Sequence, residues 1–288
     1  MLKRFPPKYR TEQELRDLQL AGLRWTAGHA WDNSPFYRKR LDESGVSPES
    51  IRSLEDLGRI PFTTADDLRD GYPLPLLAVP TREILRIHSS SGTTGKRKIL
   101  CYTRKDIDDW HDMFGRCYEM AGLSREDRVQ ICVGYGLWSA GAGFQLGAER
   151  FGAMAIPSGP GNLELQCNFL IDLETTVLCC TASMGLLVAE EVHARGLRGR
   201  LRLKKVILGA ERTSQAMLGT IRDLLGVEGT AFRTMRGEIS ERATFSHARS
   251  YEWKREFLYS VRSDAWRLNL DLSTQAASLR PCCWFRLR

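Results

Sequence analysis

A short loop of serine, threonine and glycine residues is the segment of this sequence best equipped for chemistry. It reads Ser89-Ser-Ser-Gly-Thr-Thr-Gly-Lys96. The glycines permit positive φ, so backbone N–H groups can approach an anion, while the hydroxyls add donors and the lysine adds a positive charge. This inventory suits a polyphosphate. The spacing is not that of a Walker loop, and a flexible hydroxyl-rich turn between two strands is the structural alternative.

The elements that must position this loop are predicted by hydrophobic periodicity and capping patterns. Apolar residues at helical spacing predict an entry helix from Leu15 to His29 and a second helical stretch that ends at Gly45, and two capping patterns start at Thr64 and Thr103. The pattern predicts strands at 84–87, 99–102, 129–133, 153–157, 176–180 and 203–208, and helices at 107–121, 140–151, 163–173, 184–194 and 214–225. Alternation of this kind predicts an α/β fold with a mostly parallel sheet flanked by helices.

Ligands of parallel sheets sit at the carboxyl ends of the strands, and four loops of this sequence fall there. They read Gly134-Tyr-Gly-Leu-Trp-Ser, Pro157-Ser-Gly-Pro-Gly, Thr181-Ala-Ser and Gly209-Ala-Glu-Arg. All four can line a pocket. The structural alternatives are that the aromatic residues of the first loop only pack, and that Glu211 caps the helix that begins near Thr213-Ser214.

Composition places the chain among soluble globular proteins. Its 288 residues carry a formal net charge of +7 and are 42% hydrophobic, which excludes disorder, collagen and coiled coil. No apolar run approaches the roughly 18 residues that span a bilayer, and no apolar stretch follows the basic N-terminus, so we expect a cytoplasmic protein without a membrane partner. The eight cysteines lack metal-ligand or disulfide spacing, so we expect reduced, mostly buried thiols and no metal site.

Several motifs in a fixed order resemble one family. They are Asp32-Asn-Ser-Pro-Phe-Tyr-Arg38, Pro61-Phe-Thr-Thr64, Asp67-Leu-Arg-Asp70, Ile87-His-Ser-Ser-Ser-Gly-Thr-Thr-Gly95, Tyr135-Gly-Leu137, Gly147-Ala-Glu-Arg150 and Gly209-Ala-Glu211. Over about residues 15–229 the sequence resembles the phenylacetate-CoA ligases, a family of the AMP-forming acyl-CoA synthetase superfamily. The resemblance implies the N-terminal large domain of the adenylate-forming synthetase fold, incomplete at its C-terminal side.

The resemblance also implies a reaction. A phenylacetate-like carboxylate attacks the α-phosphate of ATP, with Mg²⁺ bound, to give an acyl-adenylate and pyrophosphate, and coenzyme A then displaces AMP to form a thioester. By carry-over, the β and γ phosphates are held by Ser90, Ser91, Gly92, Thr93, Thr94, Gly95 and Lys96, with Lys96 neutralising charge; Gly209, Ala210 and Glu211 pass along the adenine; and Tyr135, Gly136, Leu137, Trp138, Ala140 and Gly141 line the acyl pocket.

The resemblance ends near Thr230. The family motifs for adenine stacking, magnesium and ribose do not follow, nor does a C-terminal domain with a catalytic lysine. Residues 231–288 instead hold 11 Lys and Arg against 6 Asp and Glu, with one glycine. We therefore expect a partial AMP-binding domain at 1–229 and a divergent Arg-rich tail at 230–288, and hypothesise a frameshifted or truncated gene product with impaired adenylation.

Two other functions are weighed. One is a noncatalytic nucleotide-binding remnant of the family. The other is a nucleic-acid binder that uses the arginine and tryptophan residues of the tail, which we disfavour because the charge of 1–230 is nearly balanced, at 31 basic and 29 acidic residues. A homodimer is left open.

Overall fold

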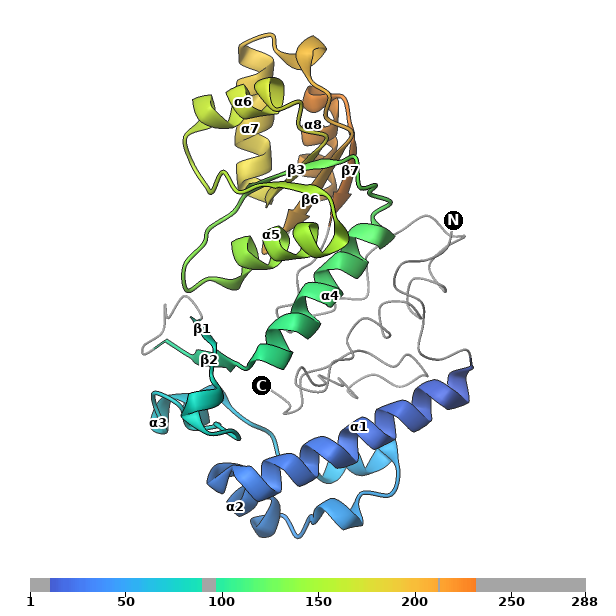
Figure 1. The fold of residues 1–288 in the computed structure, drawn as a ribbon, viewed down its shortest axis with the longest axis vertical. Helices are drawn as coiled ribbons and strands as arrows, with labels where there is room; N and C mark the ends of the chain where they lie inside the picture. Colours follow the sequence, from blue (N-terminus) through green and yellow to red (C-terminus); the bar gives the residue numbers. More distant parts are fainter. Residues whose placement is uncertain (1–10, 90–96, 212, 232–288) are drawn as a thin grey trace. The chain divides into compact units, whose positions relative to one another are not determined.

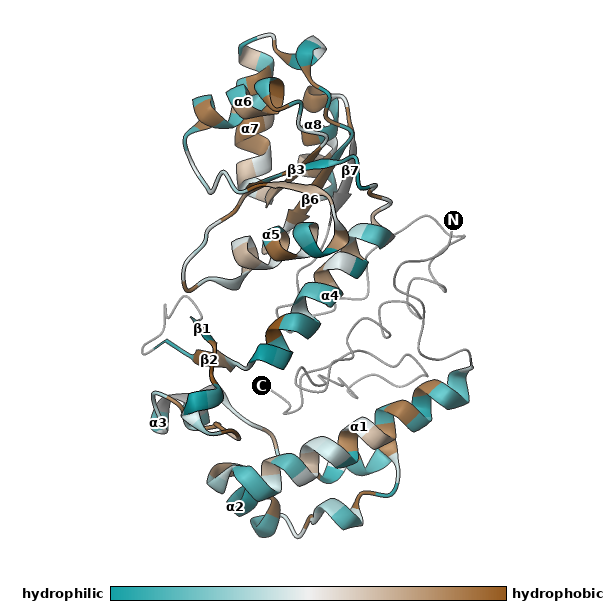
Figure 2. Ribbon diagram, in the orientation of Figure 1, coloured by the Kyte–Doolittle hydropathy of each residue, from teal (hydrophilic) through white to brown (hydrophobic). Residues whose placement is uncertain are grey.

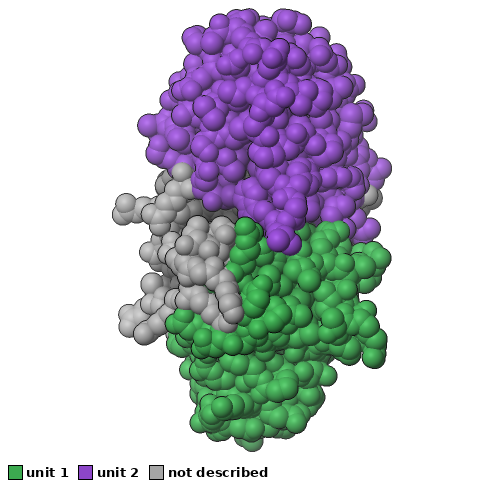
Figure 3. All heavy atoms as spheres, turned by 90° about the vertical axis from the view of Figure 1, so that its left-hand side faces the viewer, with its two compact units in different colours: residues 1–110, 239–288 green, residues 111–238 purple. Residues whose placement is uncertain are grey.

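The structure, a computed structural model, describes residues 11–89, 97–211 and 213–231 (Figure 1). Two compact units divide the chain between Trp110 and His111, inside helix α4 (Arg104–Met120) (Figure 3). Within the described ranges, the first unit runs to residue 110 and the second begins at residue 111. Nothing in residues 232–288 is described, so the prediction for the tail stays a prediction.

The first unit is built on two helices that break at a serine–proline step. Thr11 and Glu14 form a capping box at the start of α1, and Pro35 occupies the first turn of α2. Leu23 and Leu41 bring these helices into one apolar cluster with residues 46–60. The elements are α1 (Glu12–Asn33), α2 (Pro35–Glu43), η1 (Pro48–Ser50), η2 (Leu54–Arg59), α3 (Ala65–Asp70), η3 (Thr81–Glu83), β1 (Arg86–Ser89) and β2 (Ile99–Tyr102). The predicted helical entry region is confirmed.

Strands β1 and β2, both predicted, form an antiparallel pair on either side of residues 90–96, and β1 begins two residues later than predicted. Ile87 lies opposite Cys101 in this pair. His88, which precedes the expected phosphate loop, is 3% exposed, and its ring packs edge-on against Tyr102 and Trp110 at centroid distances of 5.2 and 5.5 Å. His88 therefore belongs to an aromatic cluster of the first unit.

The second unit is a five-stranded sheet in the order β4-β3-β5-β6-β7, and every neighbouring pair is parallel. Its elements are β3 (Arg128–Cys132), α5 (Ser139–Phe151), β4 (Met154–Ile156), α6 (Leu163–Asp172), β5 (Val177–Thr181), α7 (Ala182–Ala194), η4 (Arg198–Arg200), β6 (Lys205–Gly209), α8 (Gln215–Leu225) and β7 (Glu228–Ala231). The predicted parallel sheet is confirmed. Strand β6 begins two residues later than predicted, and β7 is not expected from the sequence.

Both faces of the sheet are covered, so the second unit has three layers (Figure 1). Helices α6, α7 and α8 pack on one face, against alternate strand residues such as Leu178, Cys180 and Val206. On the other face, Tyr118 at the end of α4 donates a hydrogen bond to the Phe144 carbonyl of α5 and contacts Cys179. Because both faces are buried, the central strands are almost continuously apolar, whereas α4 interleaves polar and apolar residues (Figure 2).

The amino ends of three strands meet at one carboxylate. Asp127 accepts hydrogen bonds from the Ser124 N–H at 2.6 Å, from the Thr176 hydroxyl at 2.8 Å and from the Lys204 ammonium at 3.3 Å. Burial alone raises the pKa of this carboxyl, but the hydrogen bonds and the lysine charge outweigh burial and hold the pKa below its usual value. Asp127 therefore stabilises the edge of the sheet opposite to the ligand-binding edge.

Among the described residues, no helix is both long and apolar enough to cross a membrane. Six of the eight cysteines are described, and all six are free thiols. Four of them are buried in the second unit, which confirms the expected buried thiols for this part of the chain: Cys132, Cys167, Cys179 and Cys180.

Candidate functional site

The strand order of the second unit locates its ligand-binding edge. β3 is followed in sequence by β4 on one side of it, and β5 then lies on its other side. The helix after β3, α5, covers one face of the sheet, and the helix after β5, α7, covers the other. The order therefore reverses between β3 and β5, and the crevice at the carboxyl ends of strands at such a reversal is the usual ligand site.

The segment expected to line the acyl pocket lies directly after β3, at this crevice. The Gly141 N–H donates to the Gly134 carbonyl at 3.1 Å. A Cβ built on Gly141 would lie 2.6 Å from that carbonyl oxygen and 2.9 Å from Tyr135 Cδ2, and a Cβ on Gly134 would lie 2.9 Å from Trp138 Cε3. The glycines therefore let both aromatic rings lie against the backbone at the start of α5.

Tyr135 carries an unused polar group. Its side chain is half-buried, and its hydroxyl is buried without a hydrogen-bond partner among the described residues. Burial, with a smaller effect of Cys179, raises the pKa of this phenol to about 12, so the hydroxyl is a neutral donor at physiological pH. Buried polar groups are nearly always paired, so such a hydroxyl is a candidate ligand contact. The neighbouring Gly136 has φ of 78° and Leu137 is 47% exposed.

The segment expected to contact adenine follows β6, two strands from β3. Ala210 has φ of 67°, a left-handed conformation that an alanine adopts only when its surroundings impose it. The Glu211 carboxylate accepts hydrogen bonds from the Ser183 N–H and from the Ser183 hydroxyl, both at 2.9 Å. It therefore caps α7, the helix of the adjacent strand, and Ser214 caps α8. The alternative that Glu211 caps the following helix is wrong.

The expected phosphate loop, Ser90–Lys96, lies outside the described residues. The structure brings together Tyr135, Trp138 and Gly141, and it places Gly209–Glu211 on the same edge of the sheet. Ser183 belongs to the predicted loop Thr181-Ala-Ser, but its contact with Glu211 was not expected, because a serine in the first turn of a helix is too common to signal a partner. The roles expected for all these residues stay predictions.

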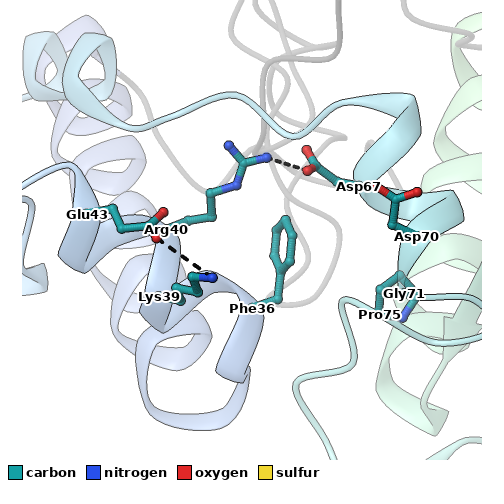
Figure 4. Close-up of a pocket in the computed structure, with 8 residues that line it drawn as sticks. All are labelled: Phe36, Lys39, Arg40, Glu43, Asp67, Asp70, Gly71 and Pro75. Atoms are coloured by element: carbon teal, nitrogen blue, oxygen red, sulfur yellow. Dashed lines mark hydrogen bonds and ion pairs between the residues drawn. The ribbon is translucent and has the colours of Figure 1, made fainter.

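A separate hollow in the first unit holds none of the expected site residues (Figure 4). Its charges are largely paired with one another. Arg40 pairs with Asp67 and lies over the Phe36 ring at 5.3 Å, and Lys39 lies 3.9 Å from Glu43. The hollow is lined by Phe36, Lys39, Arg40, Glu43, Asp67, Asp70, Gly71 and Pro75.

At this hollow, Asp67 links the motif Asp67–Asp70 to the motif Pro61–Thr64 and to helix α2. It accepts from the Thr64 N–H at 2.6 Å and from the Thr64 hydroxyl at 2.9 Å, which confirms the predicted capping pattern at the start of α3. Its ion pair with Arg40 joins α3 to α2. The contacts of Asp67 therefore join α3, the segment that precedes it and α2 within the first unit.

Within the described ranges, no group of three or more histidine, cysteine or acidic side chains could hold a metal ion. We therefore assign no magnesium ligand. Among the described residues, the carboxyl edge offers backbone N–H groups, space beside the glycines, the neutral phenol of Tyr135, and the Glu211 carboxylate with its Ser183 partner.

Comparison with known proteins identifies the fold and homologous relatives. No protein-family model matches the chain. A crystal structure of 2-hydroxyisobutyryl-CoA ligase in complex with 2-HIB-AMP and CoA superposes with a TM-score of 0.73 over 81% of the chain and 59% of that protein, at 24% identity. This likeness shows the N-terminal fold of an adenylate-forming CoA ligase.

Two curated relatives are phenylacetate-coenzyme A ligases. The protein of Escherichia coli K12 is 41% identical over 216 residues, which cover 74% of this chain and 49% of that protein. The protein of Aromatoleum evansii is 39% identical over 224 residues, which cover 77% and 51%. The chain thus spans about half the length of the relatives that it matches. Over roughly three quarters of its own length, the chain is therefore a homologue of the phenylacetate-coenzyme A ligases.

Proposed function

We propose that this chain carries the nucleotide- and carboxylate-binding part of an AMP-forming ligase that converts a phenylacetate-like acid to its coenzyme A thioester. The observation that supports this best is the strand order. The reversal between β3 and β5 lies between the segment expected to hold the acyl group, after β3, and the segment expected to hold adenine, after β6. An acyl-adenylate has its acyl and adenine groups at opposite ends, so a ligand lying across this crevice would meet both segments.

The residues of the chain would act by holding the acyl group, the adenine and the phosphates in position. Gly141 allows the ring of Tyr135, and Gly134 the ring of Trp138, to lie close to the backbone at the start of α5, which would leave an aromatic surface for the acyl group. The imposed backbone turn at Ala210 would present main-chain groups to the adenine, with Glu211 holding that turn against α7. Lys96 and the hydroxyls of residues 90–94 would neutralise the phosphates. No step in this scheme needs a covalent bond to the protein.

ATP, the carboxylate and coenzyme A would all be substrates in this reaction. The carboxylate oxygen would attack the α-phosphorus and pyrophosphate would leave; the thiol sulfur would then attack the acyl carbon and AMP would leave. Holding the reactants in line and neutralising the developing negative charge supply the acceleration in such transfers. Magnesium would arrive with ATP, and the residues described here offer no cluster to which a metal-dependent step could be assigned.

ATP binding by the purified full chain tests the first part of the proposal. We expect binding by calorimetry that Lys96→Ala weakens at least tenfold. Lys105→Ala is the matched control, since it removes the same charge from α4, where Lys105 pairs with Asp109 at 3.0 Å. Equal affinities of the two variants, or no binding by the wild type, would contradict the proposal.

Catalysis is tested separately, because the chain matches only about half the length of these relatives. Pyrophosphate release with phenylacetate and ATP would show that the chain adenylates by itself. ATP binding without pyrophosphate release would support the second candidate, a nucleotide-binding protein of the same family without turnover. The frameshift hypothesis is tested by translating the coding DNA beyond the Thr230 codon in the other two frames.

A further inference from the structure

A fully buried glutamine, for which no role was predicted, holds the loop that follows β4. Gln166 on α6 is 1% exposed. Its amide nitrogen donates to the carbonyls of Gly159 at 2.9 Å and Gly161 at 3.1 Å. Its amide oxygen accepts from Gln130 Nε2 at 2.7 Å and from the Cys132 thiol at 2.9 Å. The hydrogen-bonding capacity of this side chain is therefore fully used.

The network reaches both the loop and the base of the acyl segment. The Gly159 N–H donates to the Ile131 carbonyl at 3.0 Å, and the Ser158 hydroxyl donates to the same carbonyl at 3.2 Å. The Ser158 hydroxyl also lies 3.5 Å from the Cys132 thiol. Ile131 and Cys132 end β3, two residues before the segment Gly134–Gly141 begins. The loop is thus bonded to the strand that carries the acyl segment.

The loop backbone needs such an anchor. Gly159, Gly161 and Asn162 all have positive φ, of 72°, 76° and 45°. A left-handed backbone conformation is strained for asparagine, and fixing a glycine in one conformation costs backbone entropy. A loop with three such residues therefore adopts one shape only when its surroundings fix it. The two carbonyls bonded by Gln166 belong to this left-handed stretch.

Strand order indicates which part of a ligand this loop would meet. β4 lies beside β3 on the side away from β5 and β6. The loop after β4 is therefore next to the acyl segment and farthest from the adenine segment after β6. We propose that Gln166 is a positioning residue that fixes the loop at residues 157–161 as a wall of the acyl pocket. This inference rests on the proposed function, because the acyl pocket is itself part of that proposal.

The test measures how much the acyl group adds to binding. The probes are 5′-O-[N-(phenylacetyl)sulfamoyl]adenosine, a stable acyl-adenylate mimic, and 5′-O-sulfamoyladenosine, which lacks the acyl group. The dissociation constant of 5′-O-sulfamoyladenosine divided by that of the phenylacetyl mimic, measured for the full chain, reports the acyl contribution alone. Gln166→Met, near-isosteric but without the amide, should reduce this ratio about tenfold and change the affinity for sulfamoyladenosine less than twofold.

The matched control removes a hydrogen bond from the other end of the same network. Thr175 donates from its hydroxyl to Gln130 Oε1 at 2.9 Å and lies 3.3 Å from the Phe169 carbonyl, so its side-chain hydrogen bonds do not go to the loop. Thr175→Val should leave the ratio at the wild-type value. A loss of the acyl contribution in both variants would show a merely structural role for the network and overturn the inference.

A second pair of variants decides the matter if Gln166→Met does not fold. Gly159→Ala and Gly196→Ala both place a Cβ at positive φ, of 72° and 64°, with nothing within 4 Å, but Gly196 lies in the turn after α7. Only Gly159→Ala should reduce the acyl contribution. If the wild type shows an acyl contribution that no loop variant changes, the inference alone fails. If the wild type binds neither probe, both the inference and the proposed function fail.

Discussion

Gly141→Ala gives the sharpest test of the candidate site, because the structure predicts the opposite sign from general helix chemistry. Replacing glycine by alanine inside a helix normally stabilises a protein by about 0.5–1 kcal/mol. At Gly141 the new Cβ would lie 2.6 Å from the Gly134 carbonyl oxygen and 2.9 Å from the Tyr135 ring. The nearer atom belongs to the backbone, so it cannot rotate away, and overpacking of this kind typically costs about 1–3 kcal/mol.

Gly219→Ala in α8 is the matched control, since a Cβ there meets nothing within 4 Å. Urea unfolding of both variants, followed by circular dichroism, should show Gly141→Ala less stable than the wild type and Gly219→Ala more stable by about 0.5–1 kcal/mol. The reasoning is refuted if Gly141→Ala is as stable as Gly219→Ala, because the packing of Tyr135 against α5 would then not be tight.

Two further predictions concern carboxylates of the second unit. Glu211→Ala should cost about 1 kcal/mol as a lost helix cap and should weaken ATP binding several-fold; an unchanged ATP affinity with lowered stability would leave Glu211 as a cap only. Asp127→Asn tests the pH dependence: the folded pKa of Asp127 is depressed, so its contribution is full above the unfolded value of about 3.9 and is lost as the pH falls through the folded pKa. The stability gap between wild type and Asp127→Asn should therefore be widest near pH 6 and should shrink toward pH 3, and a gap that is constant with pH would contradict this account.

Much of the fold could be predicted from the sequence, because local patterns and tertiary packing agree in it. Apolar strand runs, helical periodicity and the capping patterns at Thr64 and Thr103 each predict an element that the structure contains. β7 was missed because Glu228-Gly-Thr-Ala231 has neither apolar alternation nor bulk, and only its pairing with β6 makes it a strand. Pairing partners are not encoded locally.

The candidate site was predictable only where its residues lie in a recognisable loop or motif. Position after a strand pointed to the loop that holds Tyr135, and the family resemblance added Gly141; the two residues do meet at the start of α5. The partner of Glu211 lies 28 residues away on another strand, and Gln166 reads as one more polar residue of an amphipathic helix. Their importance depends on which loops the sheet order brings side by side, which needed three-dimensional information.

The buried thiols of the sheet give the second unit its own internal reporters. Cys179 and Cys180 are adjacent in β5 and therefore point to opposite faces: Cys179 lies against Tyr118 of α4, and Cys180 lies in the cluster formed with α6, α7 and α8. Burial raises the pKa of Cys179 to about 12 and that of Cys180 well above its usual value, so neither thiol forms its reactive anion in the closed structure. An alkylating reagent can reach one or the other only when the matching helical layer lifts from the sheet, so the order in which the two are modified records which layer opens first.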